Sequence, residues 1–116
     1  MQPLDDRPWY RVELQRRDGR SVVVCCGELD LDATDELWDC LEQARAEGPV
    51  TLDLAGVTFM DSSGINLLLR AYAAHGRVPG AVTLRSPSEA VRRTLEMTGI
   101  EGVFRIDEAP GLASAS

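Results

Sequence analysis

The sequence predicts an α/β protein, with one domain built on a mixed β-sheet of about five strands and with helices packed on that sheet. First, two strand-like runs flank the tight-turn pair Asp18-Gly19, which predicts an opening hairpin. Second, helix-like and strand-like segments alternate after this hairpin, as they do where helices connect parallel strands. Third, the chain has 116 residues, 44% of them hydrophobic, which suits one domain with one core.

The hairpin is followed by a first helix. Residues 9–16 alternate between apolar and polar side chains, so this strand has one wet face. Residues 21–27 are almost continuously apolar, as expected of a strand covered on both faces. Asp32 is the predicted N-cap of the helix, and Gly48 with Pro49 ends it. Helical spacing defines one buried stripe, which consists of Ala33, Leu37, Cys40, Leu41 and Ala44.

A short strand at 50–54 leads into a second helix at 65–75. Apolar side chains recur in this helix at the spacing that turns one face inward. These inward residues are Ile65, Leu68, Leu69 and Tyr72.

The last third of the sequence predicts one more strand, helix and strand. A turn at Pro79-Gly80 precedes a strand at 81–84, and a final short strand lies at 103–106. Between them, Ser86-Pro87-Ser88-Glu89 has the form of a capping box, with Ser86 as the N-cap of a helix that ends at Gly99.

These elements divide the chain into a polar, flexible N-terminal segment over 1–8, a domain over 9–107 and a loose tail over 108–116. A short helix near 107–109 is weakly coded. No internal repeat or linker interrupts the domain, and an unpaired hairpin edge leaves the chain a monomer or a weak homodimer.

Charge and cysteine usage exclude several classes of protein. The formal net charge is −7 and no basic run is present, so nucleic acid is not an expected partner. No signal pattern or membrane-length apolar run is found, which predicts a cytoplasmic protein without a membrane partner. Three cysteines, Cys25, Cys26 and Cys40, lack the spacing of a metal site and are expected to be reduced core residues.

The most informative stretch is 57–64, where the chain leaves a strand and enters the second helix. The motif Asp61-Ser62-Ser63-Gly64 places two adjacent hydroxyls at that junction. One interpretation is that Asp61 or Ser62 only caps the helix, since the first N–H groups of a helix need acceptors. The other is that an exposed hydroxyl here is a phosphorylation switch, because a phosphate adds roughly −1.5 to −2 charges at one point.

A second acidic group is expected beside these serines. Glu28, Asp30 and Asp32 follow a strand that can neighbour the one preceding Asp61. Parallel strands end on the same rim of a sheet, so Glu28, Asp30, Asp61 and the serines are predicted to share one rim. A solvated turn with a helix cap is the simpler interpretation and is favoured for Asp32, whereas Glu28 and Asp30 are expected to form a contact surface.

Catalysis by Ser62 is not expected. The only histidine, His75, stands at the other end of the same helix, roughly 18 Å away at about 1.5 Å per residue. No G-x-S-x-G elbow, P-loop or G-x-G-x-x-G motif is present. We therefore expect no catalytic residue, no bound cofactor and no metal.

Three motifs together resemble the STAS-domain anti-sigma factor antagonists of bacteria. They are Gly27-Glu28-Leu29-Asp30, Leu52-Asp53-Leu54 and Phe59-Met60-Asp61-Ser62-Ser63-Gly64, and the similarity extends from about Trp9 to Ile106. Two features depart from the family pattern. Asn66 stands where the family often has glycine, and Pro110 with a short tail leaves the family's terminal helix in question.

The resemblance implies a regulatory binding protein. Such a protein binds an anti-sigma factor that is itself a serine kinase, and thereby frees the sigma factor. The kinase supplies ATP and magnesium and phosphorylates the first serine of the motif, Ser62, which releases the protein until a separate serine phosphatase restores it. The implied partner surface comprises Glu28, Asp30, Asp61, Ser62, Ser63, Gly64 and Asn66.

Two other functions stay open at this point. A STAS module can act as a scaffold or sensor in a signalling complex without any phosphorylation switch. A small hydrolase using Ser62 is the third possibility, and the position of His75 argues against it.

Overall fold

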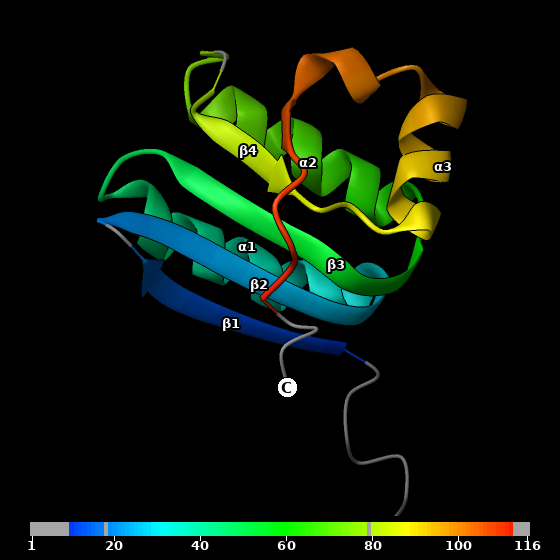
Figure 1. The fold of residues 1–116 in the computed structure, drawn as a ribbon, viewed down its shortest axis with the longest axis horizontal. Coiled ribbons are helices and arrows are strands. Elements are labelled where there is room, and N and C mark those ends of the chain that lie inside the picture. Colours follow the sequence, from blue (N-terminus) through cyan, green and yellow to red (C-terminus); the bar gives the residue numbers. More distant parts are fainter. Residues whose placement is uncertain (1–9, 18, 79, 113–116) are drawn as a thin grey trace, which may run out of the picture.

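The fold is a five-stranded sheet with helices packed on it (Figure 1). The computed structural model describes residues 10–17, 19–78 and 80–112. The predictions for 1–8, Trp9, Asp18, Pro79 and 113–116 lie outside these residues. The strands are β1 (Tyr10–Arg17), β2 (Arg20–Leu29), β3 (Val50–Met60), β4 (Val82–Arg85) and β5 (Arg105–Asp107). The helices are α1 (Leu31–Arg45), α2 (Ser62–Ala74) and α3 (Glu89–Thr98), with a 3-10 turn at Glu101–Val103.

The sheet has the predicted mixed topology. Its strands lie in the order β1-β2-β3-β4-β5, with β1 antiparallel to β2 and every later pair parallel. The hairpin, the alternation of strands and helices and the α/β fold class are therefore confirmed. Consequently β2, β3 and β4 all have their carboxyl ends on one side of the molecule.

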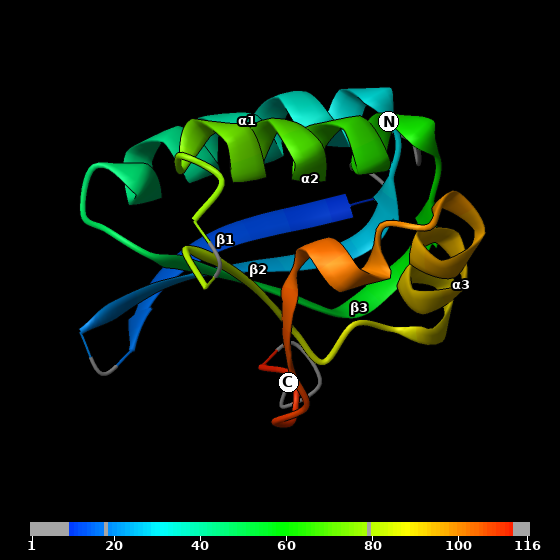
Figure 2. The ribbon, with the colours of Figure 1, turned by 90° about the horizontal axis from the view of Figure 1, so that it is seen from above.

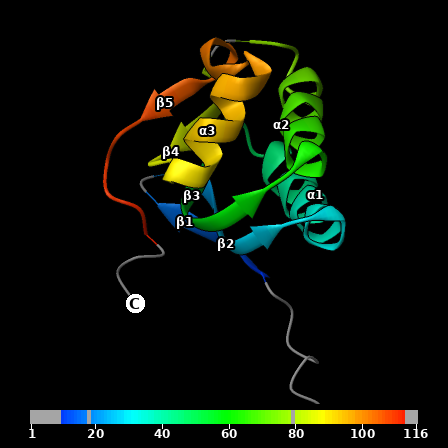
Figure 3. The ribbon, with the colours of Figure 1, turned by 90° about the vertical axis from the view of Figure 1, so that its right-hand side faces the viewer.

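The helices are arranged unequally around the sheet. Helices α1 and α2 lie side by side on one face (Figure 2). Helix α3 packs against the second half of β3, because β4 pairs only with residues 50–53 (Figure 3). The Thr94 hydroxyl donates to the Met60 carbonyl oxygen at 3.3 Å, and the Ser88 N–H donates to the Leu54 carbonyl oxygen at 3.3 Å. Helix α3 thus supports the end of β3 that leads into the motif at 61–64.

The main core lies between the sheet and its helices. Alternate residues of the two central strands face α1 and α2, and they belong to one cluster of buried side chains. Residues 21–25 of β2 are all buried, which confirms the prediction of a strand covered on both faces. The central members of the cluster include Val23, Cys25, Leu29, Leu37, Leu41, Leu52, Leu54 and Leu68.

Two predicted helix caps were wrong. Helix α1 is capped by Asp30, whose Oδ1 accepts from the Ala33 N–H at 3.1 Å, and Asp32 lies in the first turn. Helix α3 is capped by Ser88, whose hydroxyl accepts from the Val91 N–H at 3.3 Å. Ser86 instead has a positive φ of 48°, so it forms the turn that precedes the cap. In both cases a second residue of the same chemistry stood two positions away, and the end of the preceding strand decided which one caps.

Other element predictions also differ from the structure, and α2 begins at Ser62 instead of Ile65. Strand β3 continues beyond Leu54 to Met60, because β2 pairs with it along this length through two register shifts. The last strand is Arg105–Asp107, and the first residue of the predicted strand belongs to the 3-10 turn instead. No helix forms at 107–109. In α2, Leu67 is buried while Leu69 is 37% exposed, so the inward face is turned slightly from the predicted one.

Candidate functional site

Ser62 is the first residue of α2, and its side chain is exposed. The preceding residue, Asp61, is the N-cap, with its Oδ1 accepting from the Ser63 N–H at 2.9 Å. The Asp61 carbonyl oxygen accepts from the N–H groups of Gly64 and Ile65, at 3.1 and 3.2 Å. Within the described residues the Ser62 hydroxyl has no hydrogen-bond partner. At this junction the cap is therefore Asp61, and the Ser62 side chain is exposed beside it.

The predicted neighbours of Ser62 do lie on the same rim. In the parallel pairing of β2 with β3, Leu29 stands opposite Met60, so Asp30 and Asp61 follow at adjacent positions. Each of these aspartates caps a helix, which brings the N-termini of α1 and α2 together at this rim. Glu28 is exposed and stands opposite Phe59. We call Glu28, Asp30, Asp61 and Ser62 the acidic rim.

A shallow groove of about 520 Å³ adjoins the rim between α1 and α2. Two residues of the predicted surface, Ser63 and Asn66, line it. Ser63 is half-buried, whereas Asn66 is exposed. At its far end the Arg70 guanidinium stacks over the Trp38 ring, 4.2 Å from the ring centroid. The other lining residues are Leu31, Thr34, Asp35, Leu67 and Leu69.

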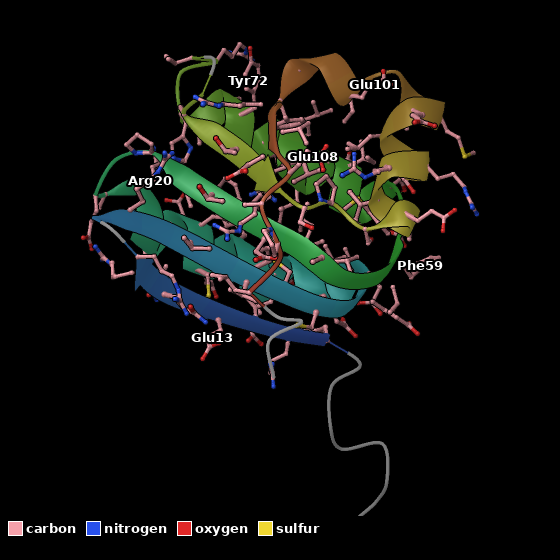
Figure 4. All side chains as sticks on the ribbon, in the orientation of Figure 1. Glu13, Arg20, Phe59, Tyr72, Glu101 and Glu108 are labelled. Atoms are coloured by element: carbon pink, nitrogen blue, oxygen red, sulfur yellow. The ribbon has the colours of Figure 1, made fainter. Side chains whose placement is uncertain are left out.

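Sequence reasoning missed the apolar part of this surface. Leu31 is 68% exposed, Phe59 is 48% exposed and Leu69 is 37% exposed, and all three belong to the segments that form the rim or the groove. Figure 4 shows Phe59 at the rim end of β3, outside the sheet. Exposed apolar side chains bordered by charged ones are typical of protein interaction sites. Strict strand alternation could not have identified Phe59, because Thr58 and Phe59 are both exposed between the buried Val57 and Met60, where the pairing with β2 shifts register.

Gly64 has a different place from the rest of the predicted surface. It is buried in the first turn of α2, and a Cβ there would lie 2.6 Å from the Met60 Cγ. Gly64 thus lets α2 begin directly over the end of β3, and it offers a partner little surface of its own.

Within the described residues, no group is placed to activate Ser62 for catalysis. His75 caps the other end of α2, and its Nδ1 lies 3.0 Å from the Ala71 carbonyl oxygen. No group of three or more His, Cys, Asp or Glu side chains is arranged to hold a metal ion in the described part of the chain. None of the helices described is long and apolar enough to cross a membrane.

The prediction of core cysteines holds fully for Cys25, whereas Cys26 and Cys40 are only half-buried, and all three are free thiols. Cys25 is buried, and burial raises the pKa of its thiol well above the ordinary value. Burial also raises the pKa of Cys40, and the carboxylates of Glu36 and Asp39 add to that effect. Both thiols therefore stay protonated at neutral pH, as expected for cysteines that only pack.

The mixed five-stranded sheet, with an exposed serine at the start of the helix that follows β3, is consistent with a STAS domain. The family model described as "Mlab, STAS domain" matches residues 12–106. The anti-sigma F factor antagonist of Lysinibacillus sphaericus is 31% identical over 94 residues, covering 78% of this chain and 80% of that protein. The chain thus belongs to the STAS-domain family of anti-sigma factor antagonists.

Solved structures agree with this assignment. An anti-sigma factor antagonist from Mycobacterium paratuberculosis has a TM-score of 0.76 at 27% identity, covering 91% of this chain and 90% of that one. The Bacillus cell fate determinant SpoIIAA in its phosphorylated form shares the fold. Its TM-score is 0.65 at 22% identity, and the match covers 90% of this chain and 96% of that one.

Proposed function

We propose that this chain is a phosphorylation-controlled anti-sigma factor antagonist. In its unmodified form it docks an anti-sigma factor with serine kinase activity through the acidic rim and the adjoining groove. The kinase then phosphorylates Ser62 with its own ATP and magnesium, and the modified chain dissociates. A serine phosphatase reverses the modification. The chain itself is a cytoplasmic binding protein and kinase substrate, not an enzyme, and works as a monomer or weak homodimer without a cofactor.

The observation that carries this proposal is the exposed hydroxyl of Ser62, which has no hydrogen-bond partner among residues 10–17, 19–78 and 80–112. A kinase needs an acceptor oxygen that it can reach and align with the γ-phosphate. Ser62 provides one without the loss of any hydrogen bond, whereas the side chain of Ser63 is half-buried beside the groove. Ser62 is therefore the acceptor and Ser63 is a contact residue.

The rim also accounts for release. A phosphate on Ser62 stands beside the carboxylate of Asp61 and on the same rim as that of Asp30, since the two aspartates directly follow the neighbouring strands β3 and β2. In the kinase it also faces the phosphates of the ADP that the reaction leaves behind. Like charges brought together in a water-excluded interface cost several kcal/mol, so the modified chain no longer docks.

The docked surface combines charge with apolar contact. Leu31, Phe59 and Leu69 supply apolar area around the carboxylates of the acidic rim. The complementary patch of the kinase then combines basic side chains, which face the carboxylates, with apolar side chains, which face the three exposed apolar residues.

Phosphate transfer to the purified chain tests the proposal. The chain is incubated with an anti-sigma kinase of the same organism and ATP with magnesium, and the product is analysed by mass spectrometry. One phosphate on Ser62 is expected. Ser62→Ala should remove it and the matched control Ser63→Ala should retain it. If the kinase binds the chain but transfers no phosphate to it, the chain is a STAS scaffold without a switch and the proposal is wrong.

A further inference from the structure

The segment that follows β5, residues 108–112, lies across the sheet face opposite α1 and α2 (Figures 1 and 2). This segment was predicted to begin a loose tail. It instead makes hydrogen bonds to two strands and an ion pair with α3. We call residues 108–112 the strap, and the sheet face beneath it the outer face.

The centre of the outer face is Asp53, which is fully buried. Its neighbours Leu52 and Leu54 face the helices, so the carboxylate of Asp53 points the other way. One oxygen, Oδ1, accepts from the Ala55 N–H at 3.2 Å. The other, Oδ2, accepts from the Leu112 N–H of the strap at 2.5 Å. A buried carboxylate is costly unless such donors surround it, so the strap completes the shell that Asp53 requires.

Arg85 provides a matching donor on the next strand. It stands opposite Asp53 in the pairing of β3 with β4, and its Nε lies 3.9 Å from Asp53 Oδ2. The same Nε donates to the Pro110 carbonyl oxygen of the strap at 3.0 Å. An acidic and a basic side chain therefore bind one N–H and one C=O of the strap, and both contacts are with its main chain.

Gly111 is where the strap approaches the sheet most closely. It is buried, and a Cβ at this position would overlap the Cβ of Ala55 and lie 3.1 Å from Asp53 Oδ1. Its φ is not in the positive region, so the limit at this position is space and not backbone conformation. The outer face thus accepts only glycine between the two main-chain contacts.

The start of the strap is held as well. Glu108 is paired with Arg92 of α3 at 2.5 Å. The Ala109 N–H donates to Asp107 Oδ1 at 2.9 Å, which turns the chain from β5 onto the outer face.

We propose that the outer face is a peptide-binding site and that the chain's own strap occupies it. Asp53 and Arg85 bind the main chain, and Ala55 selects glycine at position 111. While the strap is bound, the Asp53 carboxylate is shielded from solvent and the outer face is covered. Other proteins can then dock only at the acidic rim. When the strap detaches, a charged site for an extended, glycine-containing segment opens on the far side of the sheet.

Hydrogen exchange of the full chain, followed by NMR, tests this proposal. The Leu112 amide should exchange at least tenfold more slowly than in an unstructured peptide. Gly111→Ala should abolish that protection while the Val23 amide in strand β2, which pairs with β1 and β3, stays protected. Gly102→Ala is the matched control, since a Cβ there meets no atom within 4 Å, and it should leave both amides unchanged.

Two further measurements test whether Asp53 holds the strap and whether the strap belongs to the same molecule. Asp53→Asn keeps the shape of the side chain but removes its charge. This variant should accelerate hydrogen exchange at the Leu112 amide, as Gly111→Ala does. An unprotected Leu112 amide in the wild type, or equal protection in Gly111→Ala and wild type, would overturn the proposal. Leu112 protection that grows with protein concentration, together with a dimer in light scattering, would show that a second copy supplies the strap, and would overturn it too.

Discussion

Replacing Ser62 by aspartate should weaken binding of the anti-sigma kinase at least tenfold and leave the fold intact. The side chain is exposed and has no partner within the described residues, so the substitution disturbs no packing. A carboxylate at the first position of α2 is even favoured by the helix dipole, by roughly 0.3–1 kcal/mol. The loss therefore arises in the complex and not in the free chain.

The magnitude follows from the change in dielectric on docking. At a separation of roughly 6 Å, two unit charges repel by about 0.7 kcal/mol in water and by about 2.8 kcal/mol at an effective dielectric constant of about 20. Excluding water from between residue 62 and Asp61 thus costs about 2 kcal/mol, or about thirtyfold in affinity. The helix dipole reduces this somewhat, which leaves tenfold as the lower bound. A phosphate carries more negative charge than a carboxylate, so phosphorylation of Ser62 should weaken kinase binding more than Ser62→Asp does.

Isothermal titration calorimetry of wild type, Ser62→Asp and Ser62→Ala against the kinase measures this difference. The alanine variant should bind like the wild type, because it adds no charge. Raising the salt concentration should reduce the difference in kinase affinity between Ser62→Asp and Ser62→Ala, because salt screens the repulsion at the edge of the interface. Equal dissociation constants for the aspartate and alanine variants would refute the electrostatic account of release.

Other consequences concern stability, binding and reactivity. Asp61→Ala should lower the free energy of unfolding by about 1 kcal/mol in a urea titration because α2 loses its cap, whereas Ser62→Ala should leave it unchanged. Phe59→Ala should weaken kinase binding about tenfold with little change in melting temperature, and Met97→Ala, which truncates an 80% exposed side chain on α3, should not. Cys25 should resist alkylation in the native chain even at alkaline pH, since its raised pKa keeps the thiol protonated until well above the ordinary range, and should react once the chain is denatured.

The main features of the fold and the rim were predictable from local patterns. The Asp18-Gly19 turn signal, the alternating first strand and the continuous apolar run after it are enough to predict the hairpin. The strand–helix alternation then makes the later strands parallel, which places Asp30 and Asp61 at neighbouring strand ends. Neither inference needs information on side-chain packing.

The choice of caps and the identity of the apolar contact residues required the three-dimensional structure. Asp30 and Asp32 have the same capping chemistry, and the pairing of Leu29 with Met60 decides between them by extending β2 up to Asp30. The exposure of Leu69 depends on how α2 is rotated against α1, which no pattern within a single helix determines.

The strap was beyond sequence reasoning for a related reason. The sequence placed Asp53 in a predicted strand and in one of the three family-like motifs, and it predicted a loose tail over 108–116. The hydrogen bond from the Leu112 N–H to the Asp53 carboxylate joins residues that are 59 positions apart in the sequence. The meaning of the glycine at 111 depends on the nearby Cβ of Ala55, which only the tertiary fold brings there.

The division of tasks between Asp61 and Ser62 explains how one hydroxyl can be modified without cost to the fold. A cap residue must keep its side chain on the backbone N–H groups of the first turn, so modification of the cap would disturb the helix. Asp61 performs that task through Ser63 N–H, and its carbonyl oxygen accepts the next two N–H groups. Ser62 follows directly, at a position where the helix dipole tolerates negative charge and where the hydroxyl has no hydrogen-bond partner among the described residues. Under the proposed function, adjacent residues meet the structural requirement and the regulatory one, so phosphorylation of Ser62 would alter the docking surface while the free domain keeps its structure.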